Sequence, residues 1–126
     1  MPNIDDLLAA AHSRYARVTA QQAAAEQAAG ALLVDTRTLE QRARDGEIPG
    51  ALVIVRTVFE WRLDPTSPSR IPEARDYGVR VIVVCNQGFS SSLAAASLLD
   101  LGLTNATDVI GGFEAWKAAG LPVERR

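Results

Sequence analysis

With 126 residues, 48% of them hydrophobic and 22% charged, the chain is long enough for one domain with its own core, residues 1–126, and has the composition of a globular protein. A net charge of −2 gives no basic surface for nucleic acid or an anionic membrane, and no apolar run is long enough to span a bilayer. One cysteine excludes an internal disulfide and one histidine argues against a metal site. We find no secretory signal and no cofactor motif, and we expect a cytoplasmic protein.

The N-terminal part of the chain predicts two helices separated by a short strand. A first helix is expected over residues 4–13, within an N-terminal extension (residues 1–14). His12, near its end, is interpreted as a solvated surface residue. Residues 15–18 have the pattern of a short strand, and an alanine-rich helix is expected over residues 20–29.

A second strand is predicted over residues 31–34 and ends in polar residues. In an α/β sheet, polar residues at the carboxyl end of a strand lie where ligands bind. For Asp35 we favour a structural role, whereas Arg37 is equally consistent with a structural role and with ligand binding. A short polar helix over residues 38–45 and a third strand over residues 51–55 follow.

Residues 56–70 are the least regular part of the chain and predict a long loop. Such a loop in a compact domain is often functional. It carries Arg56 and Arg62, and arginine suits sulfur or phosphorus oxyanions because its guanidinium group donates two parallel hydrogen bonds. The alternative is that these side chains form surface ion pairs with Glu60 or Asp64.

The stretch that follows contains the only cysteine. Residues 81–84 are all β-branched, which predicts a strand buried on both faces, and they run directly into Cys85. Asn86-Gln87-Gly88 reads as a loop, and residues 93–101 have the pattern of a helix. The sequence therefore predicts a strand, a short loop and a helix N-terminus, with the thiol at the end of the strand.

This arrangement favours an anion at Cys85. A tight loop that leads into a helix turns several backbone N–H groups toward one point, and the helix dipole adds partial positive charge there. A cysteine that faces such a loop is expected to ionise readily and to act as a nucleophile. Ser90 or Ser91 is expected to cap the helix. The alternative is that Cys85 is a small buried hydrophobic residue.

A last short strand is predicted over residues 108–110 and a last helix over residues 113–119. Gly111-Gly112 lies between them, where the backbone must turn sharply or approach another segment closely. Strands that alternate with helices predict an α/β fold with a central, mostly parallel, five-stranded sheet and helices on both faces.

Over residues 19–123 the chain resembles the rhodanese (sulfurtransferase) domain family. Five motifs in the family's order carry the resemblance: Asp35-x-Arg37, Gly46-Glu47-Ile48-Pro49-Gly50-Ala51, Cys85-x-x-Gly88-x-Ser90-Ser91, Gly111-Gly112-x-x-x-Trp116 and Gly120-Leu121-Pro122-Val123. The chain departs from the family's pattern at Glu47, where histidine is usual, and at Ser90, where arginine is common.

The resemblance implies a sulfurtransferase without a cofactor. Cys85 would take a sulfane sulfur from a small donor anion such as thiosulfate and pass it, as a persulfide, to a thiol or protein acceptor. The expected substrate-binding residues are the loop Asn86, Gln87, Gly88, Phe89, Ser90 and Ser91, together with Arg37, Arg56 and Arg62. Arg56 or Arg62 could replace the charge that is missing at Ser90.

Three other interpretations compete with this one. The first is a persulfide carrier or protein-interaction module with little turnover of thiosulfate, which the serine at position 90 would favour. The second is a redox-sensing or inert domain, which would form no persulfide. The third is a cysteine-dependent phosphatase, which we consider improbable because Val84 stands where such enzymes have histidine, the distal arginine is missing and the loop is one residue shorter.

Overall fold

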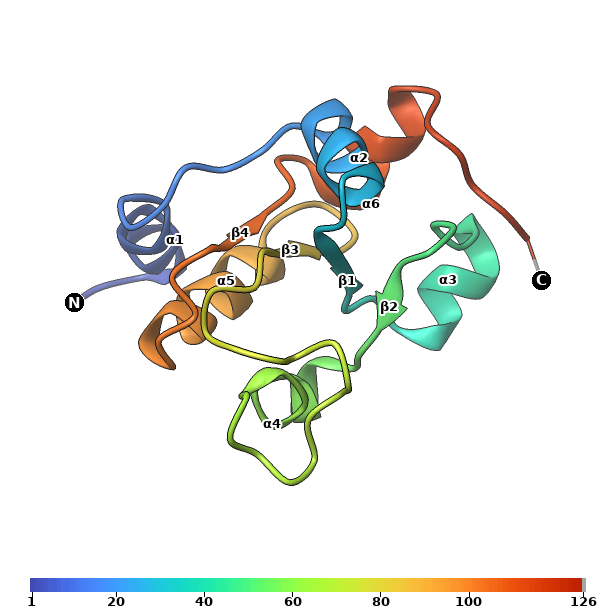
Figure 1. Ribbon diagram of the computed structural model, residues 1–126. Coiled ribbons are helices and arrows are strands. Elements are labelled where there is room, and N and C mark those ends of the chain that lie inside the picture. Colours follow the sequence, from blue (N-terminus) through green and yellow to red (C-terminus); the bar gives the residue numbers. More distant parts are fainter. Residues whose placement is uncertain (126) are drawn as a thin grey trace.

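The computed structural model describes residues 1–125 and is built on one parallel sheet (Figure 1). Its strands are β1 (Leu32–Asp35), β2 (Leu52–Val53), β3 (Val81–Val84) and β4 (Ala106–Asp108). Their order across the sheet is β2-β1-β3-β4, and every pairing is parallel. This confirms the α/β class and the parallel sheet, although the described residues form four strands and not five.

Helices surround the sheet. They are α1 (Ile4–His12), α2 (Ala20–Ala28), α3 (Leu39–Asp45), the short 3₁₀ helix η1 (Arg56–Val58), α4 (Phe59–Leu63), α5 (Ser90–Asp100) and α6 (Gly112–Ala118). Figure 1 shows α2 and α6 together on one side of the sheet and α4 on the opposite side. Helix α1 packs against α5.

The central strand β3 is buried on both faces, as its β-branched sequence predicts. Val81 and Val83 belong to a core that includes buried residues of α4 and α5. Ile82 and Val84 point the other way, into a second core that includes buried residues of α2 and α6. The alternation of side chains along a strand thus places one core on each face of the sheet and fixes the carboxyl end of β3 between them.

The fifth strand, expected over residues 15–18, is reduced to a single bridge. Val18 pairs with Val109, its N–H donating to the Asp108 carbonyl at 3.2 Å and its carbonyl accepting from the Ile110 N–H at 2.8 Å. Residues 15–17 instead contact β4 through side-chain hydrogen bonds: Tyr15 and Arg17 donate to Asp108, and the Ala16 carbonyl accepts from the Thr107 hydroxyl, so no backbone ladder forms.

The segment expected as a long loop over residues 56–70 begins with η1 and α4. Phe59 and Leu63 lie four residues apart, on one face of α4, and both are fully buried. This burial stabilises a short helix, which the prolines that follow it in the sequence had made look like part of a loop. The last strand ends at Asp108 and not at Ile110, because the N–H of Ile110 bonds to Val18 and not to β3.

Within residues 1–125, no helix combines the length and the apolar character needed to cross a bilayer.

Candidate active site

The single cysteine lies at the carboxyl end of β3, in the middle of the sheet. All residues of β3 are fully buried, and Cys85 itself is only 6% exposed. Because β3 pairs with β1 on one side and with β4 on the other, the backbone that carries Cys85 is held from both edges. Residues 86–89 then connect Cys85 to α5, which begins at Ser90.

Two backbone N–H groups point at the sulfur of Cys85. The amide nitrogen of Gly88 lies 3.2 Å from Cys85 Sγ, and the amide nitrogen of Ser91 lies 3.3 Å from it. A hydrogen bond to the charged form of a group favours that form, so both contacts stabilise the thiolate. The structure therefore brings Cys85, Gly88 and Ser91 together at one point.

The loop can lie this close to the start of α6 because two glycines have no side chain. Gly88 has φ +87°, and a Cβ there would lie 2.7 Å from the amide nitrogen of Gly111. A Cβ on Gly112 would collide with the carbonyl oxygen of Cys85, which instead accepts a hydrogen bond from the Phe113 N–H at 2.8 Å. The backbone of Gly111 and Gly112 thus packs directly against the Cys85 loop and supports it.

These contacts act on the ionisation of the thiol. Burial on its own raises the pKa of Cys85, but hydrogen bonds from Ser91, Ser90 and the Gly88 N–H together bring that pKa below its ordinary value. The hydrogen bonds outweigh the desolvation, and this environment favours the thiolate, which is the form in which a cysteine can act as a nucleophile.

The expected capping role of Ser90 or Ser91 is wrong. Helix α5 has Phe89 at its N-cap position, with no side-chain capping bond. Ser91 N–H faces the sulfur, and the hydroxyl of Ser91 instead donates to Asp108 Oδ2 at 2.7 Å. The first turn of α5 therefore leaves donors for the cysteine that an ordinary cap would satisfy.

Cys85 opens into a pocket of about 420 Å³. Its lining residues are Thr36, Arg37, Thr38, Gln41, Cys85, Asn86, Gln87, Phe89 and Ser90. The wall opposite the cysteine loop thus comes from the end of β1 and the first turn of α3. The pocket gathers most of the site residues expected from the sequence, and Phe89, 61% exposed, lies on its rim.

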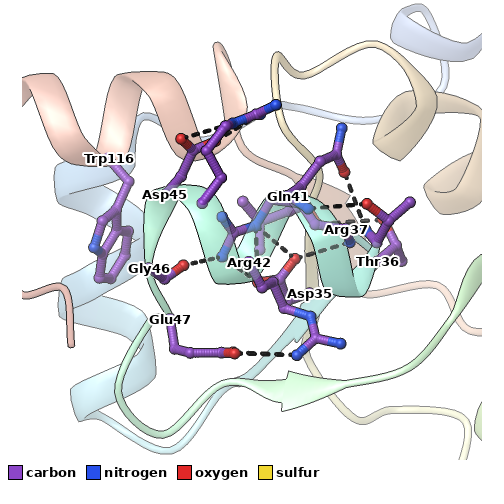
Figure 2. A network of polar contacts seen from close by, with 12 residues as sticks. Asp35, Thr36, Arg37, Gln41, Arg42, Asp45, Gly46, Glu47 and Trp116 are labelled. Atoms are coloured by element: carbon purple, nitrogen blue, oxygen red, sulfur yellow. Dashed lines mark hydrogen bonds and ion pairs between the residues drawn. The ribbon is translucent and has the colours of Figure 1, made fainter. Parts of the chain in front are cut away.

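Arg37 lines this pocket, but its guanidinium group bonds to buried groups of the protein itself (Figure 2). The side chain is fully buried and donates to both carboxylate oxygens of Asp35, at 2.8 to 3.1 Å, and to the Gly46 carbonyl at 2.8 Å. Its guanidinium also lies 3.8 Å from the centre of the Phe113 ring. This network ties the end of β1 to the turn after α3, and it accounts for Asp35 as a structural residue.

Glu47, which replaces the family's histidine, forms an ion pair with Arg42 at 3.1 Å in the same region (Figure 2).

Arg56 and Arg62 are not brought to the cysteine. Arg56 donates to the Glu60 carboxylate at 2.9 Å, and Arg62 donates to the Ser69 carbonyl at 3.0 Å. Neither residue lines the pocket of Cys85; Arg62 instead lines a separate pocket beside Trp61. The structure therefore places the charge expected from the long loop in local contacts around α4.

A buried carboxylate that the sequence analysis did not single out lies behind the cysteine loop. Asp108, at the end of β4, is fully buried and accepts hydrogen bonds from the hydroxyls of Tyr15, Ser91 and Ser92 at 2.7 to 2.9 Å. Arg17 completes the set with two more, at 2.9 and 3.0 Å. Burial opposes ionisation, but the bonds from Arg17, Ser91 and Tyr15 keep the pKa of Asp108 below its ordinary value.

Arg17 reaches the loop itself. Its Nη2 atom donates to the Gly88 carbonyl at 2.9 Å, which makes it the arginine that contacts the Cys85 loop. His12, expected at the solvated surface, is half-buried and bonds through Nε2 to Ser92 Oγ at 2.8 Å. The sequence signal for this cluster was an acidic residue, Asp108, directly before the apolar pair Val109-Ile110.

Within residues 1–125, no group of three or more histidine, cysteine, aspartate or glutamate side chains is arranged to hold a metal ion.

The comparisons with known proteins agree with the resemblance seen in the sequence. The rhodanese-like domain family matches residues 19–119. The thiosulfate sulfurtransferase GlpE of Pseudomonas entomophila is 35% identical over 106 residues, which cover 84% of this chain and 88% of the relative. GlpE of Vibrio cholerae is 33% identical over 113 residues, 90% of this chain and 96% of the relative.

Solved structures agree on the fold. A Rhodopseudomonas palustris protein of unknown function, described as a possible tyrosine phosphatase, has a TM-score of 0.88 at 33% identity and covers 98% of this chain and 96% of its own. The human single-domain sulfurtransferase TSTD1 has a TM-score of 0.70 at 26% identity, covering 82% of this chain and 96% of its own. With its matched domain, its parallel sheet and its cysteine loop, the chain belongs to the rhodanese-like domain family.

Proposed function

We propose that the protein is a sulfurtransferase that carries a sulfane sulfur on Cys85. The observation that carries this proposal is the position of the Cys85 sulfur, held by the N–H groups of Gly88 and Ser91 at the base of an open pocket. Such donors suit a sulfur anion both before and after transfer, because the same groups can follow the charge from the thiolate to a terminal persulfide sulfur. The curated relatives named as thiosulfate sulfurtransferases support the same reaction class.

The transfer would take place in two steps. In the first, the Cys85 thiolate attacks the outer sulfur of thiosulfate; a new S–S bond forms, the bond to the inner sulfur breaks, and sulfite leaves with the electron pair. In the second, a thiolate or cyanide attacks the terminal sulfur of the persulfide, and the Cys85 thiolate is restored. No general base is needed for a thiol that is already ionised, and a covalent intermediate implies ping-pong kinetics.

A second candidate function is a persulfide carrier that turns over thiosulfate slowly. Among the pocket-lining residues Arg37 is the only cation, and it is buried in its pair with Asp35. The doubly charged thiosulfate would therefore meet N–H and hydroxyl donors but no free positive charge. The exposed Phe89 on the rim suits an organic or protein-borne thiol acceptor better than a small inorganic anion.

We do not extend the phosphatase description of the Rhodopseudomonas relative to this chain. Phosphoryl transfer depends on neutralising the charge of the transferred group, and the pocket offers no exposed cation for it. The phosphatase hypothesis is checked with p-nitrophenyl phosphate, for which we expect no hydrolysis that depends on Cys85.

The first experiment is intact mass after treatment with thiosulfate. We expect the protein to gain one sulfur, to lose it on addition of cyanide, and to gain none as Cys85→Ala. Thiocyanate production by sulfur-loaded protein in the presence of thiosulfate then separates the two candidates, because an enzyme reloads rapidly and turns over repeatedly, whereas a carrier releases a burst of one equivalent and then continues only slowly. The absence of any gain with thiosulfate and with a glutathione persulfide donor would contradict both. A cytoplasmic location, where thiols are abundant, is part of the same proposal.

A further inference from the structure

The cluster behind the cysteine loop is built largely by residues that precede the matched domain. The family match begins at residue 19, whereas Tyr15 and Arg17 lie before it and bond to Asp108. Tyr15 is half-buried; burial and the contact with Asp108 raise its pKa, so its hydroxyl stays protonated and donates. The segment between α1 and α2 thus adds a cation and a hydroxyl donor to a carboxylate that residues within the matched domain bind only through the hydroxyls of Ser91 and Ser92.

Both residues whose N–H groups hold the sulfur are anchored to this cluster by a second group. Gly88 presents its N–H to Cys85 Sγ and its carbonyl to Arg17 Nη2, at 2.9 Å. Ser91 presents its N–H to the same sulfur and its hydroxyl to Asp108 Oδ2, at 2.7 Å. The Arg17–Asp108 ion pair therefore holds the two sulfur donors from the side opposite the pocket.

The conformation of Gly88 makes such an anchor necessary. A glycine with φ +87° has many other accessible conformations, and the loop around it is only a few residues long. The carbonyl of Gly88 accepts a hydrogen bond from Arg17 Nη2 at 2.9 Å; Ser92 Oγ lies 3.2 Å from the same carbonyl, but its single proton is shared with Asp108 Oδ2, which is closer at 2.9 Å. Without Arg17, a buried carbonyl would lose its stronger, charged donor, and rotation of the adjoining peptides would move the N–H away from the sulfur.

We propose that Arg17 is a positioning residue for Cys85: it holds the Gly88 carbonyl behind the loop so that the N–H groups of Gly88 and Ser91 remain aimed at the sulfur. Arg17 thereby supplies a positive charge to the Cys85 loop from the side opposite the pocket, in place of the arginine that the family commonly has at position 90. The side chain of Arg17 is 19% exposed, so its charge is only partly screened by solvent. Burial alone would lower the pKa of Arg17, but the hydrogen bond and the charge of Asp108 raise it above its ordinary value, and Tyr15 and Cys85 contribute in the same direction.

The test is the pH dependence of alkylation of Cys85 by iodoacetamide, followed by intact mass; the chain has one cysteine, so each added group reports on Cys85 alone. For Arg17→Met we expect the midpoint to rise by about one pH unit, which makes alkylation below the midpoint about tenfold slower. For Arg17→Lys, which keeps the charge but cannot reach all three acceptors, we expect a rise of about half a unit.

Arg14→Met is the matched control, because Arg14 lies in the same segment and forms an exposed ion pair with Asp100. Its midpoint should equal that of the unmodified protein. Circular dichroism and urea unfolding establish that each variant is folded. A purely structural role for Arg17 would lower the unfolding free energy and leave the midpoint unmoved, and an unmoved midpoint in folded Arg17→Met overturns the proposal. Should Arg17→Met not fold, an unmoved midpoint in Arg17→Lys overturns it equally.

This inference rests on the proposed function only where it connects the position of the two N–H groups with sulfur transfer. Alkylation needs no sulfur donor, so its midpoint decides the role of Arg17 whether or not a persulfide forms. Failure of the unmodified protein to take up sulfur would instead count against the sulfurtransferase proposal and leave the positioning role of Arg17 intact.

Discussion

Ser91 lies between the thiol of Cys85 and a buried carboxylate: its N–H faces Cys85, and its hydroxyl donates to Asp108 Oδ2 at 2.7 Å. The Ser91–Asp108 contact joins the first turn of α5 to the end of β4. Since Asp108 is fully buried, its hydrogen bonds are protected from water and hold the helix start at a defined distance from the sulfur. The polar cluster around Asp108 thus fixes the position of the Ser91 N–H that faces the sulfur.

Replacing Asp108 should destabilise the protein strongly. Asp108→Asn removes the charge that pairs with Arg17 and leaves a partly buried cation without its partner, and we expect a loss of about 3 kcal/mol in the free energy of unfolding. Asp100→Asn is the control, because Asp100 pairs with Arg14 at the exposed surface and should cost less than about 1 kcal/mol. Urea unfolding at neutral pH measures both, and equal losses would contradict the prediction.

The contribution of Asp108 should depend on pH in a defined direction. Its folded-state pKa is lowered, so its stabilising effect is complete above the unfolded value of about 3.9 and is lost as the pH falls through the lower folded-state value. The difference in unfolding free energy between the unmodified protein and Asp108→Asn should narrow below about pH 4. Urea unfolding between pH 3 and 7 checks this, and a constant difference would be inconsistent with a lowered pKa.

Cys85 should ionise more readily in the folded protein than in the unfolded chain. Its folded pKa is lowered, so the thiolate persists below the ordinary cysteine value of about 8.5 and is lost only as the pH falls through the folded value. The alkylation midpoint of the native protein should lie below that of the protein in urea, which serves as its own control. Ser90→Ala should raise the native midpoint, because a hydroxyl donor is lost. Coincident native and unfolded midpoints would refute a stabilised thiolate.

Introducing arginine at position 90 should improve thiosulfate chemistry. Ser90 is exposed and lines the pocket, so the side chain of Ser90→Arg would add the free cation that the pocket lacks. We expect kcat/KM for thiosulfate to rise about tenfold, equivalent to about 1.4 kcal/mol of transition-state stabilisation. Ser90→Gln has a similar reach without the charge and should show no such gain. A rise of the same size in both variants would mean that charge is not the missing element.

Substitution of Gly88 should cost more than its backbone angle alone explains. Gly88 and Gly30 both have positive φ, +87° and +110°, but a Cβ at Gly30 meets nothing within 4 Å whereas one at Gly88 would lie 2.7 Å from the Gly111 nitrogen. Gly30→Ala should lose about 1 kcal/mol of stability, and Gly88→Ala should lose at least twice that and also raise the Cys85 midpoint. Equal losses in urea unfolding would show that the loop can move away from Gly111.

The arginines should separate into structural and dispensable residues. Arg37→Met removes the partner of the buried Asp35 and should cost about 3 kcal/mol or more in unfolding free energy. Arg56→Ala and Arg62→Ala break only partly exposed or backbone contacts away from the pocket, so sulfur loading by intact mass should be unchanged. Slower loading in either of these two folded variants would show that residues 56–70 contribute a charge to sulfur loading after all.

Local patterns in the sequence determined the β-branched strand that ends in Cys85, the glycine pair that allows close backbone approach and the alternation of strands and helices. These features depend on the period of side chains along the chain and on the conformations that glycine permits, both of which act over a few residues. They sufficed to indicate the fold class and the position of Cys85 at the carboxyl end of a central strand. The capping of α5 and the fifth strand were predicted wrongly, because tertiary hydrogen bonds compete for the same groups.

Only the tertiary structure decided which charges meet the cysteine loop. Arg17 and Asp108 are separated by most of the chain, and no local pattern relates them, yet they pair behind Gly88 and Ser91. Arg56 and Arg62 carry the same charge as Arg17 but have partners within a few residues. Electrostatic contacts depend on distance in space and on burial, and neither is encoded in residue spacing. The sequence could therefore locate Cys85 but not Arg17, the cation that binds the loop around it.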